Sequence, residues 1–283
     1  MTTGDTTALA VDLGYDARTD AGLKRSSNED ALLAEPPVFL VADGIGGHAS
    51  GELASAAVVA AFRELLCTGE PVELGTVRAA LREAERRVKE LSDGTERSAG
   101  STVTGVVLLR YEGAPHWLIL NVGDSRVYRQ FESELEQLTV DHSLAQEEVE
   151  SGRLSRRRAR EAPNRNVITR AIGSADARAD SWIMPVTTGE RLLLCSDGLH
   201  SEVPDEEIRA ILAMTGRPAS ATAALVDAAK RAGGKDNITV VVVDVRGGGA
   251  APVSDASSRG AESAGGASAD DEVDDTTWDT VPV

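Results

Sequence analysis

Cysteine is scarce in this sequence, and so are aromatic residues. Only two of the 283 residues are cysteine, and aromatic residues make up 3% of the chain. Two cysteines are too few for a disulfide framework, and neither Cys67 nor Cys195 has the CxxC or Cys/His spacing that holds zinc. We therefore expect the protein to work in the reducing cytoplasm.

Long apolar runs are also missing. No stretch reaches 18 consecutive apolar residues, so the sequence predicts no membrane span. The first residues, MTTGDTTALAVDLG, lack the basic flank and the long apolar run of a signal peptide. No coiled-coil seam is visible, and we expect a soluble monomer.

Positive charge is in deficit throughout the chain. With 46 acidic and 29 basic residues, the formal net charge is −17. A broad nucleic-acid surface or anionic-membrane surface needs clustered positive charge, so we expect neither partner. Residues 247–283 hold eight of the acids against one arginine, which leaves a milder −10 for residues 1–246.

The composition changes at Gly247, and we expect two regions. Residues 1–246 are predicted to form one folded domain. Residues 247–283 are rich in Gly, Ala, Ser and acids, so they bury too little apolar surface to offset their ordering entropy and are predicted to be a disordered tail. Trp278, with Thr276 and Thr277 beside it, is either a docking motif with phosphate acceptors or part of an inert solubilising tail.

The hydrophobic pattern predicts strands and helices in separate blocks. A buried strand is expected at 36–42, and two amphipathic helices follow, the second with an apolar stripe from Val77 to Leu91. Short runs within 102–139 then indicate an antiparallel meander. The remaining expected elements are a helical segment at 142–162, a buried run at 192–195, helices at 205–214 and 219–232, and a strand at 238–245. Such blocks favour an α+β fold.

Four aspartates stand at the edges of hydrophobic strands. Asp43, Asp124 and Asp197 each follow an apolar run, and Asp236 precedes one. In an antiparallel layered fold these strand ends can meet at one edge, where the carboxylates would repel one another unless cations lay among them. An all-oxygen set of ligands suits Mg²⁺ or Mn²⁺ rather than zinc.

A plainer interpretation exists for each of these aspartates. Asp-Gly after a strand is a common hairpin turn signal, and a single instance is best explained as a turn. Four instances beside buried strands, with Arg25 and Glu29-Asp30 upstream, favour the metal site.

Eight short motifs follow one another between residues 25 and 237. They are Arg25-Ser-Ser-Asn-Glu29-Asp30, Val41-Ala-Asp43-Gly44-Ile-Gly-Gly-His48, Gly100-Ser-Thr102, Gly123-Asp124-Ser-Arg126, Asp141-His-Ser143, Thr169-Arg-Ala-Ile-Gly173, Ser196-Asp197-Gly198 and Asp236-Asn237. Together and in this order they resemble the bacterial metal-dependent protein serine/threonine phosphatases of type 2C, the PPM family. The resemblance implies a four-layer α-β-β-α sandwich with two central antiparallel sheets.

The resemblance also implies a centre of two Mn²⁺ or Mg²⁺ ions at one end of the sheets. Carried over by motif, Asp43 would bridge both ions and the carbonyl of Gly44 would bind the first. Asp197 and Asp236 would bind the second ion. Asp124, together with Asp197, would match a third and weaker metal site.

Three further residues receive roles from the same resemblance. Glu29 and Asp30 would hold metal-bound waters, and Asp30 is also a candidate proton shuttle for the leaving oxygen. Arg25 would bind the substrate phosphate. The implied reaction is hydrolysis of phosphoserine and phosphothreonine in proteins by a metal-bridging hydroxide, opposing a serine/threonine kinase. The rival hypothesis is a pseudophosphatase that serves as a binding or scaffold module.

One position departs from the eukaryotic members, which have a histidine directly after Asp-Gly. Ile45 stands there, and His48 either takes over an acid role or caps a turn. His142 is expected to hold a turn, whereas His116 and His200 are interpreted as ordinary surface or strand-end residues. The arginine-rich segment 153–160 corresponds to the mobile flap of the family, and it either attracts acidic phosphoprotein segments or forms a solvated helix face.

Overall fold

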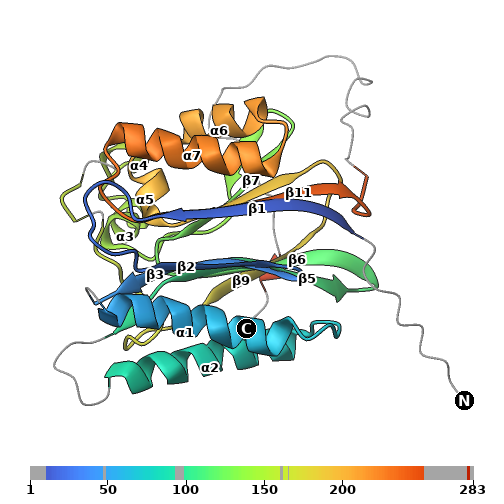
Figure 1. The fold of residues 1–283 in the computed structure, drawn as a ribbon, viewed down its shortest axis with the longest axis horizontal. Helices are drawn as coiled ribbons and strands as arrows, with labels where there is room; N and C mark the ends of the chain where they lie inside the picture. The colour runs from blue at the N-terminus through green and yellow to red at the C-terminus, as the bar shows by residue number, and fades with distance from the viewer. Residues whose placement is uncertain are drawn as a thin grey trace, which may run out of the picture.

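Two antiparallel β-sheets lie face to face, and helices cover the outer face of each. The computed structural model describes residues 11–46, 49–92, 99–159, 162–164, 166–251 and 279–280. From top to bottom in Figure 1 the layers are helices α6 and α7, the first sheet, the second sheet, and helices α1 and α2. The predicted α-β-β-α sandwich is thus confirmed.

The first sheet has five strands in the order β1-β11-β10-β7-β8. These strands are β1 (Asp12–Asp20), β7 (Arg126–Phe131), β8 (Glu134–Gln137), β10 (Arg191–Cys195) and β11 (Ile238–Gly247). Strands β10 and β11 are buried on both faces, since Leu192–Cys195 and Val240–Val243 are all fully buried. Continuous runs of apolar and β-branched residues favour such strands.

The second sheet runs in the order β12-β9-β6-β5-β3-β2, with β4 paired to β3 off this path. Its strands are β2 (Asp30–Glu35), β3 (Val38–Ile45), β4 (Gly100–Ser101), β5 (Val103–Tyr111), β6 (Ala114–Val122), β9 (Asp180–Pro185) and β12 (Asp279–Thr280). The antiparallel meander predicted within 102–139 is only partly right: β5 pairs with β6 and β7 with β8, but β6 and β7 lie in different sheets.

Seven helices lie in the described part of the chain. They are α1 (Ala49–Leu66), α2 (Leu74–Ser92), α3 (Leu144–Glu150), α4 (Arg156–Ala159), α5 (Asp197–His200), α6 (Asp205–Met214) and α7 (Pro218–Ala232). Helix α2 buries the predicted stripe, since Val77, Leu81, Ala84 and Val88 face the core. None of the described helices combines the length and apolar character that crossing a membrane requires.

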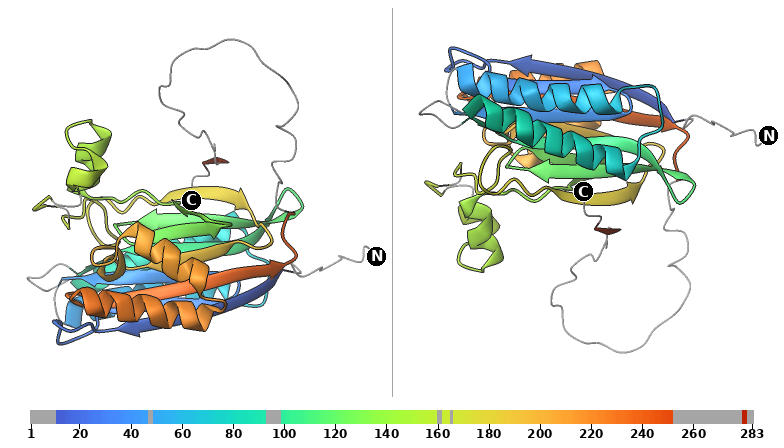
Figure 2. Two further views of the ribbon diagram at one scale, coloured as in Figure 1. Left: turned by 90° about the horizontal axis from the view of Figure 1, so that it is seen from above. Right: turned by 90° about the horizontal axis from the view of Figure 1, so that it is seen from below.

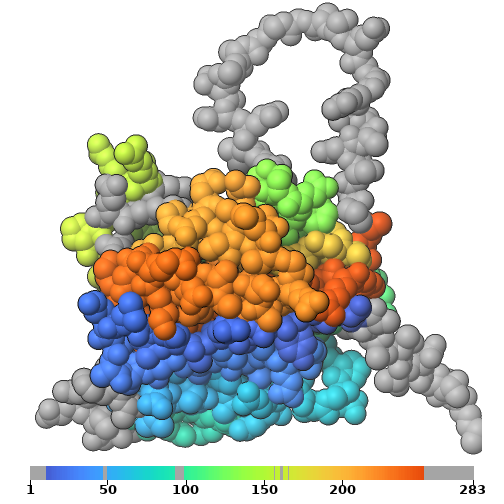
Figure 3. Space-filling view, turned by 45° about the horizontal axis from the view of Figure 1, so that its top comes forward, coloured from blue at the N-terminus to red at the C-terminus, as the bar shows by residue number. Residues whose placement is uncertain are grey.

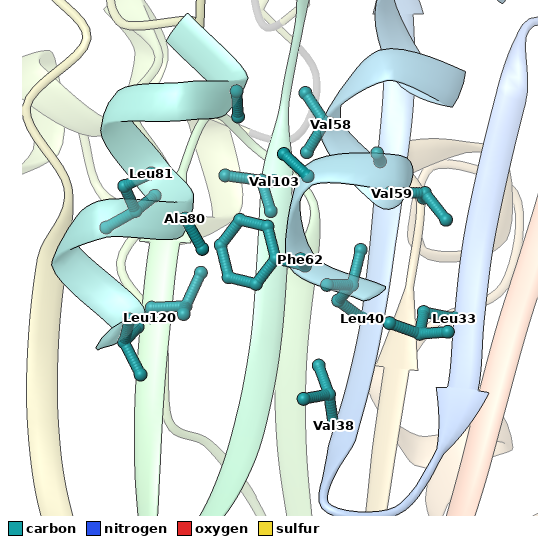
Figure 4. Packing of buried hydrophobic residues seen from close by; sticks show 14 of the residues in the cluster. Leu33, Val38, Leu40, Val58, Val59, Phe62, Ala80, Leu81, Val103 and Leu120 are labelled. Atoms are coloured by element: carbon teal, nitrogen blue, oxygen red, sulfur yellow. The ribbon is translucent and has the colours of Figure 1, made fainter. Parts of the chain in front are cut away.

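The hydrophobic core has three layers that match the sandwich. Figure 4 shows the layer between α1, α2 and the second sheet, where Phe62 of α1 lies among Leu40, Val103 and Leu120 of the strands. A second layer fills the space between the two sheets, and a third joins the first sheet to α6 and α7. Burial of these layers orders the strand ends, which carry the polar motifs.

The structure differs from the predicted elements in several places. Strands β1 and β2 were not predicted, because their sequences DLGYDARTD and DALLAE carry acids and their side chains are mostly only partly buried. The expected helix at 142–162 is instead two short helices, α3 and α4, separated by a turn at Gly152 with φ 72°. This segment stands away from the body at one end, drawn yellow-green in Figures 2 and 3.

The tail does not begin as predicted at Gly247. Strand β11 includes Gly247, and the N–H of Ala250 donates to the carbonyl of Val186 at 2.7 Å, so backbone pairing continues past the composition change. Asp279–Thr280 form β12 against Trp182–Ile183 of β9. Backbone hydrogen bonds need no apolar side chains, which is why composition misjudged these two short stretches. Residues 252–278, including Thr276, Thr277 and Trp278, lie outside the described residues.

Candidate metal centre

The hairpin of β2 and β3 places two of the predicted acids side by side. Asp30 and Asp43 are direct cross-strand partners, because Asp30 opens β2 and Asp43 lies near the end of β3. Gly44 follows Asp43, and a Cβ at this position would lie 2.2 Å from the carbonyl oxygen of Gly51 in α1. Glycine is therefore needed at residue 44 for close packing against the start of α1, and no turn occurs there.

Asp197 and Asp236 reach the same end of the sandwich from the first sheet. Strands β10 and β11 are antiparallel neighbours, so the residues that follow β10 and those that precede β11 lie at one end of the sheet. Gly198 brings them together, since a Cβ there would lie 1.9 Å from the carbonyl oxygen of Asn237. The turn interpretation of the two Asp-Gly motifs is thus wrong, because the glycines at 44 and 198 permit close packing between segments.

Asp124 joins this cluster through a chain of hydroxyl groups. The hydroxyl of Thr102 accepts from the N–H of Asp43 at 2.9 Å and lies 2.9 Å from the hydroxyl of Ser125. Gly123, with φ 109°, packs against Thr102, where a Cβ would lie 2.5 Å from the threonine methyl group. The loop after β6 is thereby fastened to the end of β3.

The electrostatics show that the predicted carboxylates interact. Burial is the main cause that raises the pKa of Asp43 well above its ordinary value, and the charges of Asp30, Asp197, Asp124 and Asp236 raise it further. Burial and then the charges of Asp124, Asp236 and Asp30 likewise raise the pKa of Asp197. Burial first raises the pKa of Asp30 to about 6 and that of Asp124 to about 7. The tertiary structure has therefore brought all of these acids to one site.

These acids repel one another, and their unpartnered oxygens are suited to binding divalent cations. Asp30, Asp124 and Asp197 each have one buried carboxylate oxygen with no hydrogen-bond partner among the described residues. An uncompensated buried carboxylate is costly, and a hard cation with oxygen ligands removes that cost. The same acids do not form a closed cage, since no three described His, Cys, Asp or Glu side chains are arranged to hold a metal ion by themselves. Mg²⁺ sites of the open kind use one or two carboxylates and several waters, which this arrangement permits.

Arg25 is the basic side chain that the structure places beside the acids. Its guanidinium donates to the carboxylate of Asp236 at 2.7 Å, and more than half of the arginine side chain remains exposed. The hydrogen bond to Asp236 is the main cause that raises the pKa of Arg25, with smaller contributions from Glu29 and Asp197. A planar, half-exposed guanidinium at the rim can bind a phosphate in a fork.

Glu29 is held through its backbone. Its N–H donates to the side-chain oxygen of Asn237 at 2.9 Å, and its carbonyl accepts from the hydroxyl of Ser55 at 2.6 Å. A Cβ on Gly51 would lie 2.2 Å from the Glu29 carboxylate, so this carboxylate packs against the first turns of α1.

Sequence reasoning missed the residues that hold the acids in place. The hydroxyl of Ser196 donates to Asp30 at 2.8 Å and accepts from the N–H of Thr239 at 3.0 Å. The side-chain amide of Asn237 donates to the carbonyl of Ser27 at 2.9 Å, so it fastens the segment that carries Arg25 and Glu29. Ser196 and Asn237 each adjoin a predicted metal ligand in its motif, and this adjacency was the available signal.

Two histidines, His142 and His200, form hydrogen bonds with the loop that carries Asp124. His142 accepts from the N–H of Gly123 at 3.1 Å and binds Asp180 at 3.0 Å, which matches its expected role of holding a turn. His200 is not an ordinary surface residue, since its ring lies 2.9 Å from the carbonyl oxygen of Asp124. Burial is the main cause that lowers its pKa to about 3, so the imidazole is neutral. His48 lies outside the described residues.

A cavity of about 460 Å³ opens between the α3–α4 segment, the β7–β8 hairpin and helices α5 and α6, and Asp124 lines it. Arg153, Arg157 and Arg158 are exposed and are not among its lining residues. What the α3–α4 segment presents to the cavity is uncharged, for example Ala145, Gln146 and Val149. In the described part of the segment, the arginines therefore face solvent.

The sequence matches one protein family over most of its length. The family model for protein phosphatase 2C matches residues 23–228. Serine/threonine protein phosphatase PstP of Mycobacterium tuberculosis is 37% identical over 238 residues, which cover 82% of this chain and 45% of that protein. Serine/threonine phosphatase stp of Listeria monocytogenes is 34% identical over 239 residues, which cover 80% of this chain and 94% of that protein. The chain thus spans about half the length of the mycobacterial relative and nearly all of the listerial one.

Solved structures agree with the sequence comparison. The crystal structure of M. tuberculosis PstP/Ppp superimposes with a TM-score of 0.77 at 36% identity, covering 84% of this chain and 100% of that one. The PstP catalytic domain in complex with two manganese ions superimposes with a TM-score of 0.74 at 35% identity, covering 83% and 98%. Both the family expected from the motifs and its fold are confirmed.

Proposed function

Because the chain belongs to the protein phosphatase 2C family, we propose that it is a metal-dependent phosphatase of phosphoserine and phosphothreonine in proteins. The observation that carries the proposal is the cluster of buried carboxylates with unpartnered oxygens at one end of the sandwich. The relatives named above are serine/threonine phosphatases, and one solved relative holds two manganese ions.

The residues that would hold two Mn²⁺ or Mg²⁺ ions are those that the motifs indicate. We assign Asp43 and the Gly44 carbonyl, Asp197 and Asp236 to the ions, with Glu29 and Asp30 holding metal-bound waters. Asp124 is assigned with Asp197 to a third, weaker site. When bound, divalent cations supply activation of water near neutral pH and neutralise charge on the phosphoryl group.

Arg25 supplies the contact to substrate. Its half-exposed guanidinium can donate two parallel hydrogen bonds to phosphoryl oxygens, which fixes the phosphate for in-line attack. The exchange of Asp236 for phosphate as the partner of Arg25 costs little, because exposed ion pairs contribute only about 0–1 kcal/mol.

Asp30 is the group that we assign to proton transfer. Burial raises its pKa to about 6, near the pH at which the protein would work. A carboxyl group with such a pKa exchanges a proton readily at neutral pH, and the hydroxyl of Ser196 orients it. Asp30 can therefore protonate the leaving oxygen of the serine or threonine side chain.

The rival hypothesis, a pseudophosphatase, is disfavoured by the same residues. A decayed site is expected to lose at least one ligand or the phosphate-binding arginine. Arg25, Asp43, Asp197 and Asp236 are all present, and the charges of Asp124, Asp236 and Asp30 raise the pKa of Asp197 after burial, which supports a shared site. A binding module would retain the cost of these buried charges without using them.

The proposal extends to partners and location. We propose that the substrates are phosphorylated proteins, including serine/threonine kinases and their targets, and that the protein acts as a monomer. We also propose a cytoplasmic location, because both cysteines are free thiols and disulfides are rare in reducing compartments.

The test is hydrolysis of a phosphothreonine peptide by the full chain with Mn²⁺ and with a chelator. We expect the chelator to abolish turnover and Asp43→Asn to lower kcat by at least about 10³-fold, because the charge that organises the centre is lost. Asp227→Asn is the matched control, since Asp227 is exposed on α7. Turnover that survives the chelator or Asp43→Asn would refute the proposal.

A further inference from the structure

Helix α5 connects two of the acids. It is only four residues long, beginning at Asp197 and ending at His200. The Nε2 atom of His200 lies 2.9 Å from the backbone carbonyl oxygen of Asp124. A carbonyl oxygen can only accept, so Nε2 carries the hydrogen and donates it. One helical turn thus links the segment that carries Asp197 to the loop that carries Asp124.

The loop that receives this bond is fastened on its other sides as well. The N–H of Gly123 donates to His142, and its carbonyl accepts from the side chain of Asn121 at 3.1 Å and from the N–H of His142 at 2.9 Å. Ser125 binds the hydroxyl of Thr102. Strands β7 and β10 already pair Arg126 with Cys195, and the bond of His200 adds a link from the segment beyond Asp197 directly to the backbone of Asp124.

The position of the Asp124 carboxylate depends on the loop that carries it. One of its oxygens is buried and has no hydrogen-bond partner among the described residues. The carboxylate is therefore placed through its own backbone, and a shift of the loop moves it directly. Asp124 and Asp197 are close enough for the charge of Asp124 to be the largest charge effect on Asp197.

We propose that His200 is a positioning residue, which holds Asp124 at the spacing from Asp197 that a divalent cation needs to bind between these two segments. The inference rests on the proposed function, because it presumes that the carboxylates take up metal. The hydrogen bond of the His200 ring goes to the backbone carbonyl of Asp124, so His200 acts through the backbone of Asp124. Its contribution lies in the Nε2–H donor, and the shape of the ring is secondary.

Two substitutions separate the donor from the shape. His200→Phe keeps a planar ring and removes the donor, whereas His200→Gln keeps an N–H donor at about the same reach. Residues that orient metal ligands typically contribute 10–100-fold to metal affinity, and we expect the low end of this range because the bond is to a backbone carbonyl. His116→Phe is the matched control, because His116 pairs with Pro185 at the opposite end of β6 from the centre.

The experiment is calorimetric titration of the metal-free full chain with Mn²⁺. We expect His200→Phe to weaken the weakest resolved Mn²⁺ site about tenfold, His200→Gln to stay within about threefold of the wild type, and His116→Phe to bind as the wild type does. In an Asp124→Asn background, His200→Phe should have no further effect, since the carboxylate that it positions is gone. If His200→Phe does not fold, His200→Asn replaces it, because the shorter amide does not reach the Asp124 carbonyl.

The outcomes distinguish the inference from the function on which it rests. Unchanged Mn²⁺ affinity in His200→Phe, an equal loss in His200→Gln, or a loss that persists in the Asp124→Asn background would each overturn the positioning role. A wild-type protein that binds no Mn²⁺ would overturn the proposed function and the inference together. Normal Mn²⁺ binding by the wild type with no effect at His200 would refute the inference alone.

Discussion

Two aspartates beside the same loop, Asp141 and Asp124, have pKa values that are shifted in opposite directions. Asp141 receives two hydrogen bonds from Arg126, at 2.8 and 2.6 Å. Burial alone would raise its pKa, but the charge and hydrogen bonds of Arg126 outweigh burial and hold the pKa below its ordinary value. Asp124 is also buried and has no such arginine, so burial followed by the charge of Asp141 raises its pKa to about 7.

The contrast extends to the other buried acids. Glu190 is paired with Arg129 at 2.7 Å, and Asp244 is paired with Arg191 at 2.6 Å. These acids carry their own cation and hold strands together. Asp43, Asp124 and Asp197 form no such ion pair among the described residues, and burial is the main cause that raises the pKa of each. Within one chain, a buried acid that is paired with arginine is structural, and a buried acid without a cation indicates a site that takes up a cation from outside.

The largest expected effect is on the free energy of unfolding, which should fall when the arginine-paired Asp141 is replaced and rise when the unpaired Asp124 is replaced. Asp141→Asn leaves Arg126 buried and uncompensated, so we expect the free energy of unfolding to fall by about 3–5 kcal/mol. Asp124→Asn removes an uncompensated charge, so we expect metal-free stability to rise. Urea unfolding in the presence of a chelator measures both, and a loss of stability in both variants would end the distinction.

The next largest effect is expected for Arg25. Arg25→Ala should lower kcat/KM for a phosphothreonine peptide about 100-fold, because we propose that this arginine contacts the transferred phosphoryl group. Its metal-free stability should change by less than about 1 kcal/mol, since the pair with Asp236 is exposed. Steady-state kinetics and urea unfolding check these values, with Arg209→Ala on α6 as the control. An unfolded Arg25→Ala protein would instead make this arginine structural.

A third effect follows from the raised pKa values. The pKa of Asp30 is raised to about 6 and that of Asp124 to about 7, against an ordinary value of 3.8. The folded metal-free protein therefore retains protons that the unfolded chain has lost, and its stability falls as pH rises from about 4 to about 7. His200 opposes this trend, because its pKa is lowered to about 3 and only the unfolded chain protonates it below pH 6.5.

The carboxylates outnumber this histidine, so their trend decides the outcome. In chelator we expect Tm to fall by roughly 5 °C or more between pH 5 and pH 7. With Mn²⁺ the trend should reverse, because the cation binds the ionised carboxylates. Thermal unfolding at several pH values, with and without Mn²⁺, tests this prediction. A metal-free Tm that rises over this range would contradict the assigned pKa shifts.

The smallest effect concerns the arginines of the α3–α4 segment. Replacing Arg156–Arg158 by Ala should weaken turnover of a phosphoprotein about threefold and leave a small aryl phosphate unchanged, because exposed charges steer association. The effect should disappear at high salt. Replacement of the exposed Arg217 and Arg231 is the control. Equal losses on both substrates would show that the arginines do not attract the protein substrate.

Much of the centre could be predicted because its ligands adjoin strong local signals. Asp43 and Asp197 follow continuous apolar runs, and such runs form buried strands in almost any context. Helix α6 has the predicted bounds, because its buried residues Ile208 and Leu212 recur at helical spacing. The partners of these acids were not predictable in this way. Ser196 and Thr102 bind residues 166 and 59 positions away, and no local pattern encodes such contacts.

The sequence by itself determined the family, the α+β class and the identity of the acids, because these depend on residue type and on order along the chain. Only the tertiary structure decided which acids are paired with arginine and which are left without a cation. It also decided that His200 binds the Asp124 loop and that Arg153, Arg157 and Arg158 face solvent. These outcomes depend on distances between segments far apart in sequence, which only packing of the two sheets and their helices sets.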